Sequence, residues 1–153
     1  VEKSSKGREI GICRDIYVTN TNHYLYENKR NLFNSIASHG DHVISLNNGI
    51  ILSYNNHSIQ SCELKYNDTN IIGVQYHPEY TLEFLGKYLK IRKKTLFEQN
   101  IYNDNELFNI FVNYLIEGTF QNKQYNDMFN IPTELINNKY NHREIINWVN
   151  NLN

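Results

Sequence analysis

The first half of the chain alternates between apolar and polar positions, which is the pattern of β-strands. Between residues 8 and 76, short alternating or β-branched runs are separated by turns that are rich in Asn, Gly and Asp. The run 70–76 is apolar and β-branched, and this composition favours a strand that is covered on both faces. A short helix is expected to interrupt the strands near residues 28–33.

The second half of the chain changes to a helical period after Pro78. Thr81 suits a helix N-cap, and the apolar positions that follow it share one helix face: Leu82, Phe84, Leu85, Tyr88, Leu89 and Ile91. A second helix is predicted over about 105–117, ended by Gly118, and a third over about 142–152. Residues 119–140 are expected to form a loop. The pattern therefore predicts one α/β domain that is strand-rich over 8–79 and helical over 81–153.

Composition narrows the classes of partner. The chain has 153 residues, of which 40% are hydrophobic and 20% charged, and this is enough for one globular domain. A net charge of −1 gives no electrostatic reason to expect binding to nucleic acid or to a membrane surface. Two cysteines outside any motif favour a reducing, cytoplasmic environment. The sequence contains no Gly-rich phosphate loop, and we expect no cofactor.

The most informative motif lies between the two halves, where His77 and Glu79 are separated by Pro78. Proline disfavours the helical region for the residue before it, so His77 should lie extended at the end of its strand. In open α/β sheets, ligands bind at the carboxyl ends of strands. A carboxylate beside a histidine can hold the imidazole in one tautomer and stabilise its protonated form. The motif therefore predicts two members of a nucleophilic triad, and the alternative is a surface turn.

A second candidate site comprises Ser38, His39, Gly40 and Asp41. The glycine permits a ligand to approach the backbone closely, and neighbouring N–H groups could bind a carboxylate. The same residues also fit a glycine turn between two strands. A zinc site formed by His39, Asp41 and His42 is disfavoured, because ligands packed this closely on a turn do not converge on one metal. We therefore expect no metal.

Taken together, these motifs resemble the C-terminal part of the class I glutamine amidotransferases. The matching segments are residues 7–11, 38–41, 50–53, 60–63, 73–79 and 145–149. The most similar subgroup is that of stand-alone domains like the amidotransferase part of GMP synthase. The resemblance implies a three-layer, flavodoxin-like α/β fold with a sheet and flanking helices. Residues 1–153 would be the C-terminal portion of that domain, with its N-terminal part missing.

The resemblance also implies a reaction, the hydrolysis of the glutamine side-chain amide to supply ammonia by a Cys-His-Glu triad. In that family a thiolate attacks the amide, a histidine protonates the departing ammonia, and water then hydrolyses the glutamyl thioester. His77 and Glu79 match the histidine and glutamate positions. The segment 38–41 matches the backbone that holds the α-amino and α-carboxylate groups of glutamine. The implied partners are glutamine, or a γ-glutamyl compound, and a synthetase that uses the ammonia.

The chain departs from the family pattern at the nucleophile. The family's cysteine lies on a Gly-x-Cys-x-Gly elbow, which should precede Gly7 and would therefore lie upstream of Val1 or on a second polypeptide. Cys13 and Cys62 lie in alternating runs without an elbow, and we interpret both as small packing residues. We therefore expect a fragment of a glutamine-hydrolysing enzyme. The alternative is a truncated, non-catalytic or vestigial chain that acts as a binding or structural protein.

Overall fold

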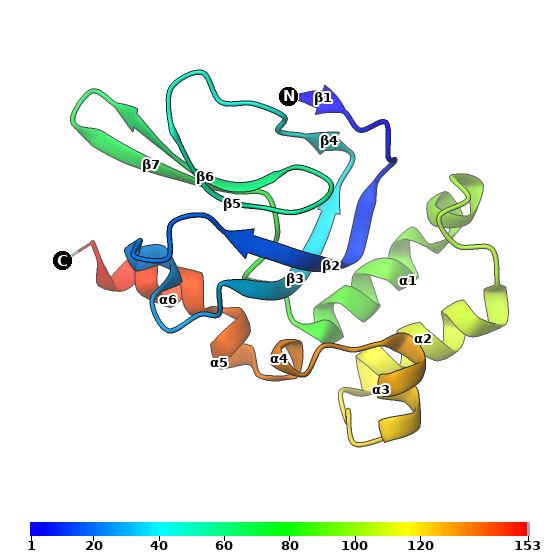
Figure 1. Ribbon diagram of the computed structural model, residues 1–153. Coiled ribbons are helices and arrows are strands. Elements are labelled where there is room, and N and C mark those ends of the chain that lie inside the picture. Colours follow the sequence, from blue (N-terminus) through cyan, green and yellow to red (C-terminus); the bar gives the residue numbers. More distant parts are fainter. Residues whose placement is uncertain (153) are drawn as a thin grey trace. The chain divides into compact units, whose positions relative to one another are not determined.

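The chain forms two compact units, shown in the computed structural model of Figure 1, which describes residues 1–152. The first unit, here called the sheet unit, comprises Val1–Glu79 and Lys139–Asn153. The second unit, here called the helical unit, comprises Tyr80–Asn138. Both candidate sites from the sequence lie in the sheet unit.

The sheet unit is built on a five-stranded antiparallel sheet with the strand order β3-β2-β5-β6-β7. Its strands are β2 (Glu9–Val18), β3 (Leu32–His39), β5 (Ile50–Tyr54), β6 (Ile59–Tyr66) and β7 (Thr69–Val74). Two short strands, β1 (Glu2–Lys3) and β4 (Asp41–His42), form a separate antiparallel pair. The alternating pattern therefore predicts correctly that this half of the chain is built mainly of strands.

A bulge in β2 explains how this strand fills the core. The register between β2 and β3 shifts between Cys13 and Ile16, and Asp15 has a φ of 53°. A bulge inserts one residue and so changes which face later side chains point to. As a result, Cys13 and Ile16 are both fully buried, although they are an odd number of positions apart.

The prediction of a strand covered on both faces over residues 70–76 is wrong. Strand β7 ends at Val74, pairs only with β6 among the described residues, and has exposed residues over 69–71. A run of β-branched residues indicates a strand but does not distinguish a central strand from the edge of a hairpin. Beyond Val74 the chain turns inward: the N–H of Gln75 donates to the carbonyl of Gln60 (2.8 Å), and the N–H of His77 to that of Ile36 (2.7 Å).

The helix expected near residues 28–33 is also wrong. A single 3₁₀ turn, η1 (Tyr24–Tyr26), lies earlier in the chain, and β3 already begins at Leu32. The ring of His23 accepts a hydrogen bond from the N–H of Leu25 and caps this turn. The turn ends at Glu27, whose ψ of 130° is not helical, and Asn28 follows with a φ of 58°, so no helix continues from it.

The core of the sheet unit surrounds Tyr76, which is 2% exposed. The other buried members of this cluster come from β2, β3, β5 and the η1 turn: Cys13, Ile16, Leu25, Tyr26, Phe33, Ala37 and Leu52. The rings of Phe33 and Tyr76 meet edge to face, with centroids 5.5 Å apart. The residue immediately before His77 is therefore a central packing residue.

The helical unit confirms the two strongest helix predictions. Helix α1 (Leu82–Glu98) begins after Thr81, whose hydroxyl accepts a hydrogen bond from the N–H of Phe84. Helix α2 (Asn105–Glu117) ends at Gly118, which has a φ of 67°. The two helices pack closely at Gly86, where a Cβ atom would lie 2.9 Å from the side chains of Leu115 and Ile116.

The loop predicted over residues 119–140 is wrong in part, because it contains α3 (Lys123–Phe129) and α4 (Thr133–Ile136). Asn122 caps α3 at its start, and Asn130, with a φ of 49°, ends it. Asparagines that indicate a loop by composition therefore act here as helix caps. The chain ends with α5 (Asn138–Asn141) and α6 (Arg143–Asn150), and α6 confirms the third predicted helix with shorter ends. Within residues 1–152, no helix is long and apolar enough to cross a membrane.

Candidate active site

The imidazole of His77 and the carboxylate of Glu79 form a close pair. Nδ1 of His77 lies 2.7 Å from Oε1 of Glu79, across Pro78. A carboxylate can only accept a hydrogen bond, so this contact places the proton of a neutral imidazole on Nδ1. The other ring nitrogen, Nε2, then has a lone pair with which to accept a proton. The pair has the geometry of a general base with its orienting group.

The exposure of this pair suits proton transfer. The side chain of His77 is 29% exposed and that of Glu79 is 51% exposed. The backbone of His77 is nevertheless held, because its N–H donates to the carbonyl of Ile36 in β3. The imidazole is therefore accessible while its attachment to the sheet is rigid.

The second candidate segment follows β3 directly. Ser38 and His39 are the last two residues of β3, and Asp41 opens β4. Ile36, which binds the backbone of His77, is only two residues before Ser38, so the fold brings the two predicted sites to neighbouring parts of one strand. A Cβ atom at Gly40 would meet only the side chain of Arg8, at 3.7 Å, so packing within the described chain does not require a glycine there.

His39 is held inside the sheet unit. Its Nε2 lies 3.0 Å from Oε2 of Glu9, and its Nδ1 lies 3.1 Å from the backbone oxygen of Asp41. Only 9% of its side chain is exposed. Both nitrogens therefore face groups of the protein, and the side chain acts as a support for the segment 38–41.

Glu9 is the centre of a buried polar network that the sequence analysis missed. Its Oε1 accepts from the amide of Asn55 (2.7 Å) and from the thiol of Cys13 (3.2 Å). Its Oε2 accepts from the amide of Gln60 (3.0 Å). Burial alone would raise the pKa of Glu9, but the hydrogen bonds from His39, Cys13 and Asn55 outweigh burial and lower the pKa to about 2. The sequence could have indicated this network, because Glu9 is an acidic residue that shares a strand face with apolar residues.

Neither cysteine lies in an environment that favours a thiolate. Cys13 is fully buried, and its burial together with the charge of Glu9 raises the pKa of its thiol far above the usual range. Cys62 lies on β6 opposite Gly73, and partial burial raises the pKa of its thiol, although a backbone hydrogen bond at Gly73 acts in the opposite direction. A nucleophilic cysteine requires a lowered pKa. Both cysteines therefore fit the packing role expected from the sequence.

The histidines near the second site pack against one another. Ring centroids lie 5.0 Å apart for His39 and His42, and 5.6 Å apart for His42 and His57. Over residues 1–152, no group of three or more His, Cys, Asp or Glu side chains is arranged to hold a metal ion.

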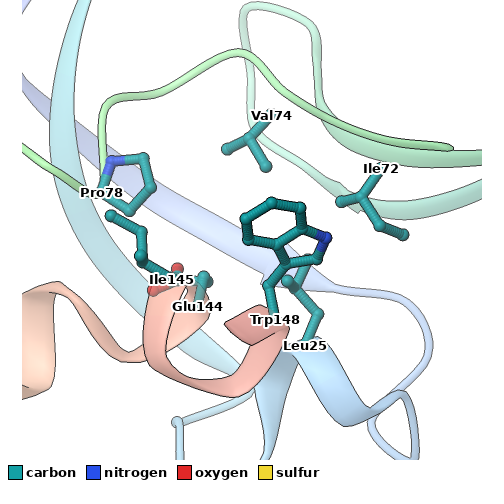
Figure 2. Close-up of a pocket in the computed structure, with 7 residues that line it drawn as sticks. All are labelled: Leu25, Ile72, Val74, Pro78, Glu144, Ile145 and Trp148. Carbon is teal, nitrogen blue, oxygen red and sulfur yellow. The ribbon is translucent and has the colours of Figure 1, made fainter. Parts of the chain in front are cut away.

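A cavity of about 250 Å³ lies beside the His-Pro-Glu motif (Figure 2). Its lining is mainly apolar and comes from β7, α6, the η1 turn and Pro78: Leu25, Ile72, Val74, Pro78, Ile145 and Trp148. The indole of Trp148 lies between Leu25 and the two β7 side chains. Glu144 is the single charged residue of this lining, and it is directed into the core (1% exposed).

Comparisons with known proteins bear on the family and the fold of this chain. A family model described as glutamine amidotransferase class-I matches residues 4–94. The crystal structure of a glutamine amidotransferase from Thermotoga maritima is similar, with a TM-score of 0.59 and 14% sequence identity, over 95% of this chain and 54% of that chain. The chain thus spans about half the length of that protein, and this likeness confirms the α/β fold. Among curated proteins, none matches significantly. Since the family model covers more than half of the sequence, the chain belongs to the class-I glutamine amidotransferase family.

Proposed function

We propose that this chain provides the acid–base half of a glutamine-hydrolysing site, with His77 as the general base and acid and Glu79 as its orienting group. The observation that carries the proposal is the contact of 2.7 Å between Nδ1 of His77 and Oε1 of Glu79. This contact directs Nε2 to the reacting atoms and stabilises the imidazolium that forms during the reaction.

The proposed reaction proceeds through a thioester. Nε2 of His77 first accepts the proton of the cysteine thiol, and the resulting thiolate attacks the carboxamide carbon of glutamine. His77 then donates this Nε2 proton to the leaving nitrogen, so that ammonia departs. Nε2 then accepts a proton from water, which attacks the thioester and releases glutamate and the thiolate. The backbone of residues 38–41 would hold the α-amino and α-carboxylate groups of glutamine.

The nucleophile of this scheme lies outside the residues described. Cys13 is buried and donates its thiol proton to Glu9, and the pKa of Cys62 is raised, so neither supplies a thiolate near neutral pH. A further segment of the same protein or a second polypeptide would carry the cysteine, and a synthetase would be the natural consumer of the ammonia.

The test uses the full-length protein expressed from its natural reading frame, together with any chain that copurifies with it. Release of ammonia and glutamate from glutamine is measured, and a diazoketone analogue of glutamine is used to alkylate the nucleophile. We expect hydrolysis, and a single labelled cysteine that is neither Cys13 nor Cys62. If glutamine is not hydrolysed and no cysteine is labelled, the proposal is wrong and a non-catalytic binding or structural role replaces it.

A further inference from the structure

The residue before His77 is fixed by a long-range hydrogen bond. The hydroxyl of Tyr76 donates to Oε1 of Glu144 at 2.6 Å, across 68 positions of the sequence. Regular pairing of β7 with β6 ends at Val74, and backbone hydrogen bonds at Gln75 and His77 hold the chain on either side of Tyr76. The side chain of Tyr76 therefore adds a restraint to a backbone that the sheet already holds.

Glu144 is itself held by a buried cation. Nζ of Lys29 lies 2.5 Å and 2.6 Å from the two carboxylate oxygens of Glu144. The two side chains are 0% and 1% exposed, so this ion pair is shielded from water. A buried ion pair is tolerated only when its geometry and hydrogen bonding are complete, and it then allows few alternative arrangements.

Helix α6, which carries Glu144, is fastened to the same loop as Lys29. The amide of Asn147, one turn after Glu144, donates to the carbonyls of Leu25 and Glu27, both at 2.9 Å. The position of the Glu144 carboxylate is therefore determined by the fold rather than by Tyr76 alone.

Burial keeps the phenol of Tyr76 protonated. Its removal from water, followed by the negative charge of Glu144, raises the pKa of Tyr76 well above its usual value. The hydroxyl therefore keeps its proton near neutral pH and can donate it to Glu144.

We infer that Lys29, Glu144 and Tyr76 form a positioning device for the base of the active site. Tyr76 and Glu144 are positioning residues that set the orientation of His77, whose own N–H is held by Ile36 on the other side. The inference rests on the proposed function, in which His77 is the base. A displacement of about 1 Å at a reacting group can reduce a rate a hundredfold, so loss of one hydroxyl this close to the base should be visible in catalysis.

The test compares Tyr76→Phe with Tyr26→Phe in the full-length protein. Both tyrosines are buried, at 2% and 3% exposure, and both hydroxyls belong to the same polar cluster. The hydroxyl of Tyr26 contacts Ser53 and Ser61, and lies at a longer 3.4 Å from the hydroxyl of Tyr76. Its removal leaves the bond from Tyr76 to Glu144 in place and so controls for the loss of a buried hydroxyl. Two readouts are needed: kcat and KM for glutamine, and the ¹⁵N and ¹H NMR signals of the His77 imidazole.

We expect Tyr76→Phe to lower kcat by roughly tenfold to a hundredfold at unchanged KM, and to shift the His77 imidazole signals. Tyr26→Phe should leave kcat within about twofold of the wild type and the His77 signals in place. Equal kcat and unshifted His77 signals in Tyr76→Phe would overturn the inference. If the wild type does not hydrolyse glutamine, the proposed function has failed, and the NMR comparison alone decides whether Tyr76 positions His77.

Discussion

Two of the histidine–glutamate pairs in the sheet unit, His77–Glu79 and His39–Glu9, are similar in distance and opposite in environment. His77 and Glu79 lie 2.7 Å apart with side chains that are 29% and 51% exposed, whereas His39 and Glu9 lie 3.0 Å apart with exposures of 9% and 8%. The second pair is surrounded by amide and thiol donors, and the first is flanked by a proline. A short His–Glu distance therefore does not by itself identify a catalytic pair. A histidine that acts as a base must also have an imidazole that substrate can reach, and a buried histidine does not.

The two pairs also differ in the number of hydrogen bonds that each carboxylate accepts. Glu9 accepts hydrogen bonds from three side chains besides its contact with His39, so its charge stabilises the fold. Glu79 is half exposed, and solvent screens its contribution to stability. We therefore expect changes at the exposed pair to alter catalysis and changes at the buried pair to alter stability.

The largest expected effect is on catalysis, from His77→Ala. Removal of a general acid and base reduces turnover by about a hundredfold to ten-thousandfold, and the full-length protein should lose glutamine hydrolysis by this factor. The melting temperature should change little, because the imidazole is partly exposed and the backbone N–H that binds Ile36 of β3 is retained in the variant. Ammonia release and a thermal melt on the same sample check both statements. Unchanged turnover would remove His77 from the mechanism.

The next effect is on stability, from Glu9→Ala. This change removes the charged acceptor that the buried amides of Asn55 and Gln60 share, together with the contact to His39, which should cost about 2 to 4 kcal/mol in the free energy of unfolding. Glu79→Ala is the matched control and should cost less than about 0.5 kcal/mol, since surface changes of this kind have small effects. Urea denaturation of both variants measures the difference. Equal losses in the two variants would contradict the contrast between the pairs.

Acid should weaken the buried pair in a defined pH range. The pKa of Glu9 falls from 4.5 to about 2 in the folded chain, so its stabilisation is fully present above pH 4.5 and is lost as the pH falls toward 2. The loss should reach roughly 3 kcal/mol at the lower limit. Urea midpoints measured from pH 6 to pH 2 should show this dependence in the wild type and a flatter one in Glu9→Gln. Parallel curves for the two proteins would assign the acid sensitivity to other carboxylates.

The smallest effect is expected from Glu79→Gln. The amide can still contact Nδ1 of His77 but no longer stabilises the imidazolium with a full charge, so turnover should fall about tenfold, less than for His77→Ala. The measurement is kcat for ammonia release in the full-length protein, compared with the wild type and with His77→Ala. Full activity in Glu79→Gln would reduce Glu79 to a turn residue.

Several parts of the fold were predictable because they depend on neighbours in the sequence. Thr81 and Gly118 bound helices through hydrogen bonds and dihedral angles that involve three or four residues. The α/β class followed from the change of period after Pro78. Reasoning from sequence neighbours gave the wrong structure in two segments. The β-branched residues of 70–76 lie partly in an exposed hairpin strand, and asparagines within 119–140 act as helix caps.

The candidate site likewise has a part that the sequence predicts and a part that only the folded structure reveals. The spacing of His77 and Glu79 makes their contact a local event across one proline, and the sequence alone predicts it. The supports of the site are not local: Glu9 meets Gln60 and Tyr76 meets Glu144 only after distant segments have folded together. By itself the sequence determined the periods, the caps and the His-Pro-Glu motif, because these depend on short-range geometry. Only the tertiary structure decided which His–Glu pair is buried and which is open, because burial depends on the segments that pack around each pair.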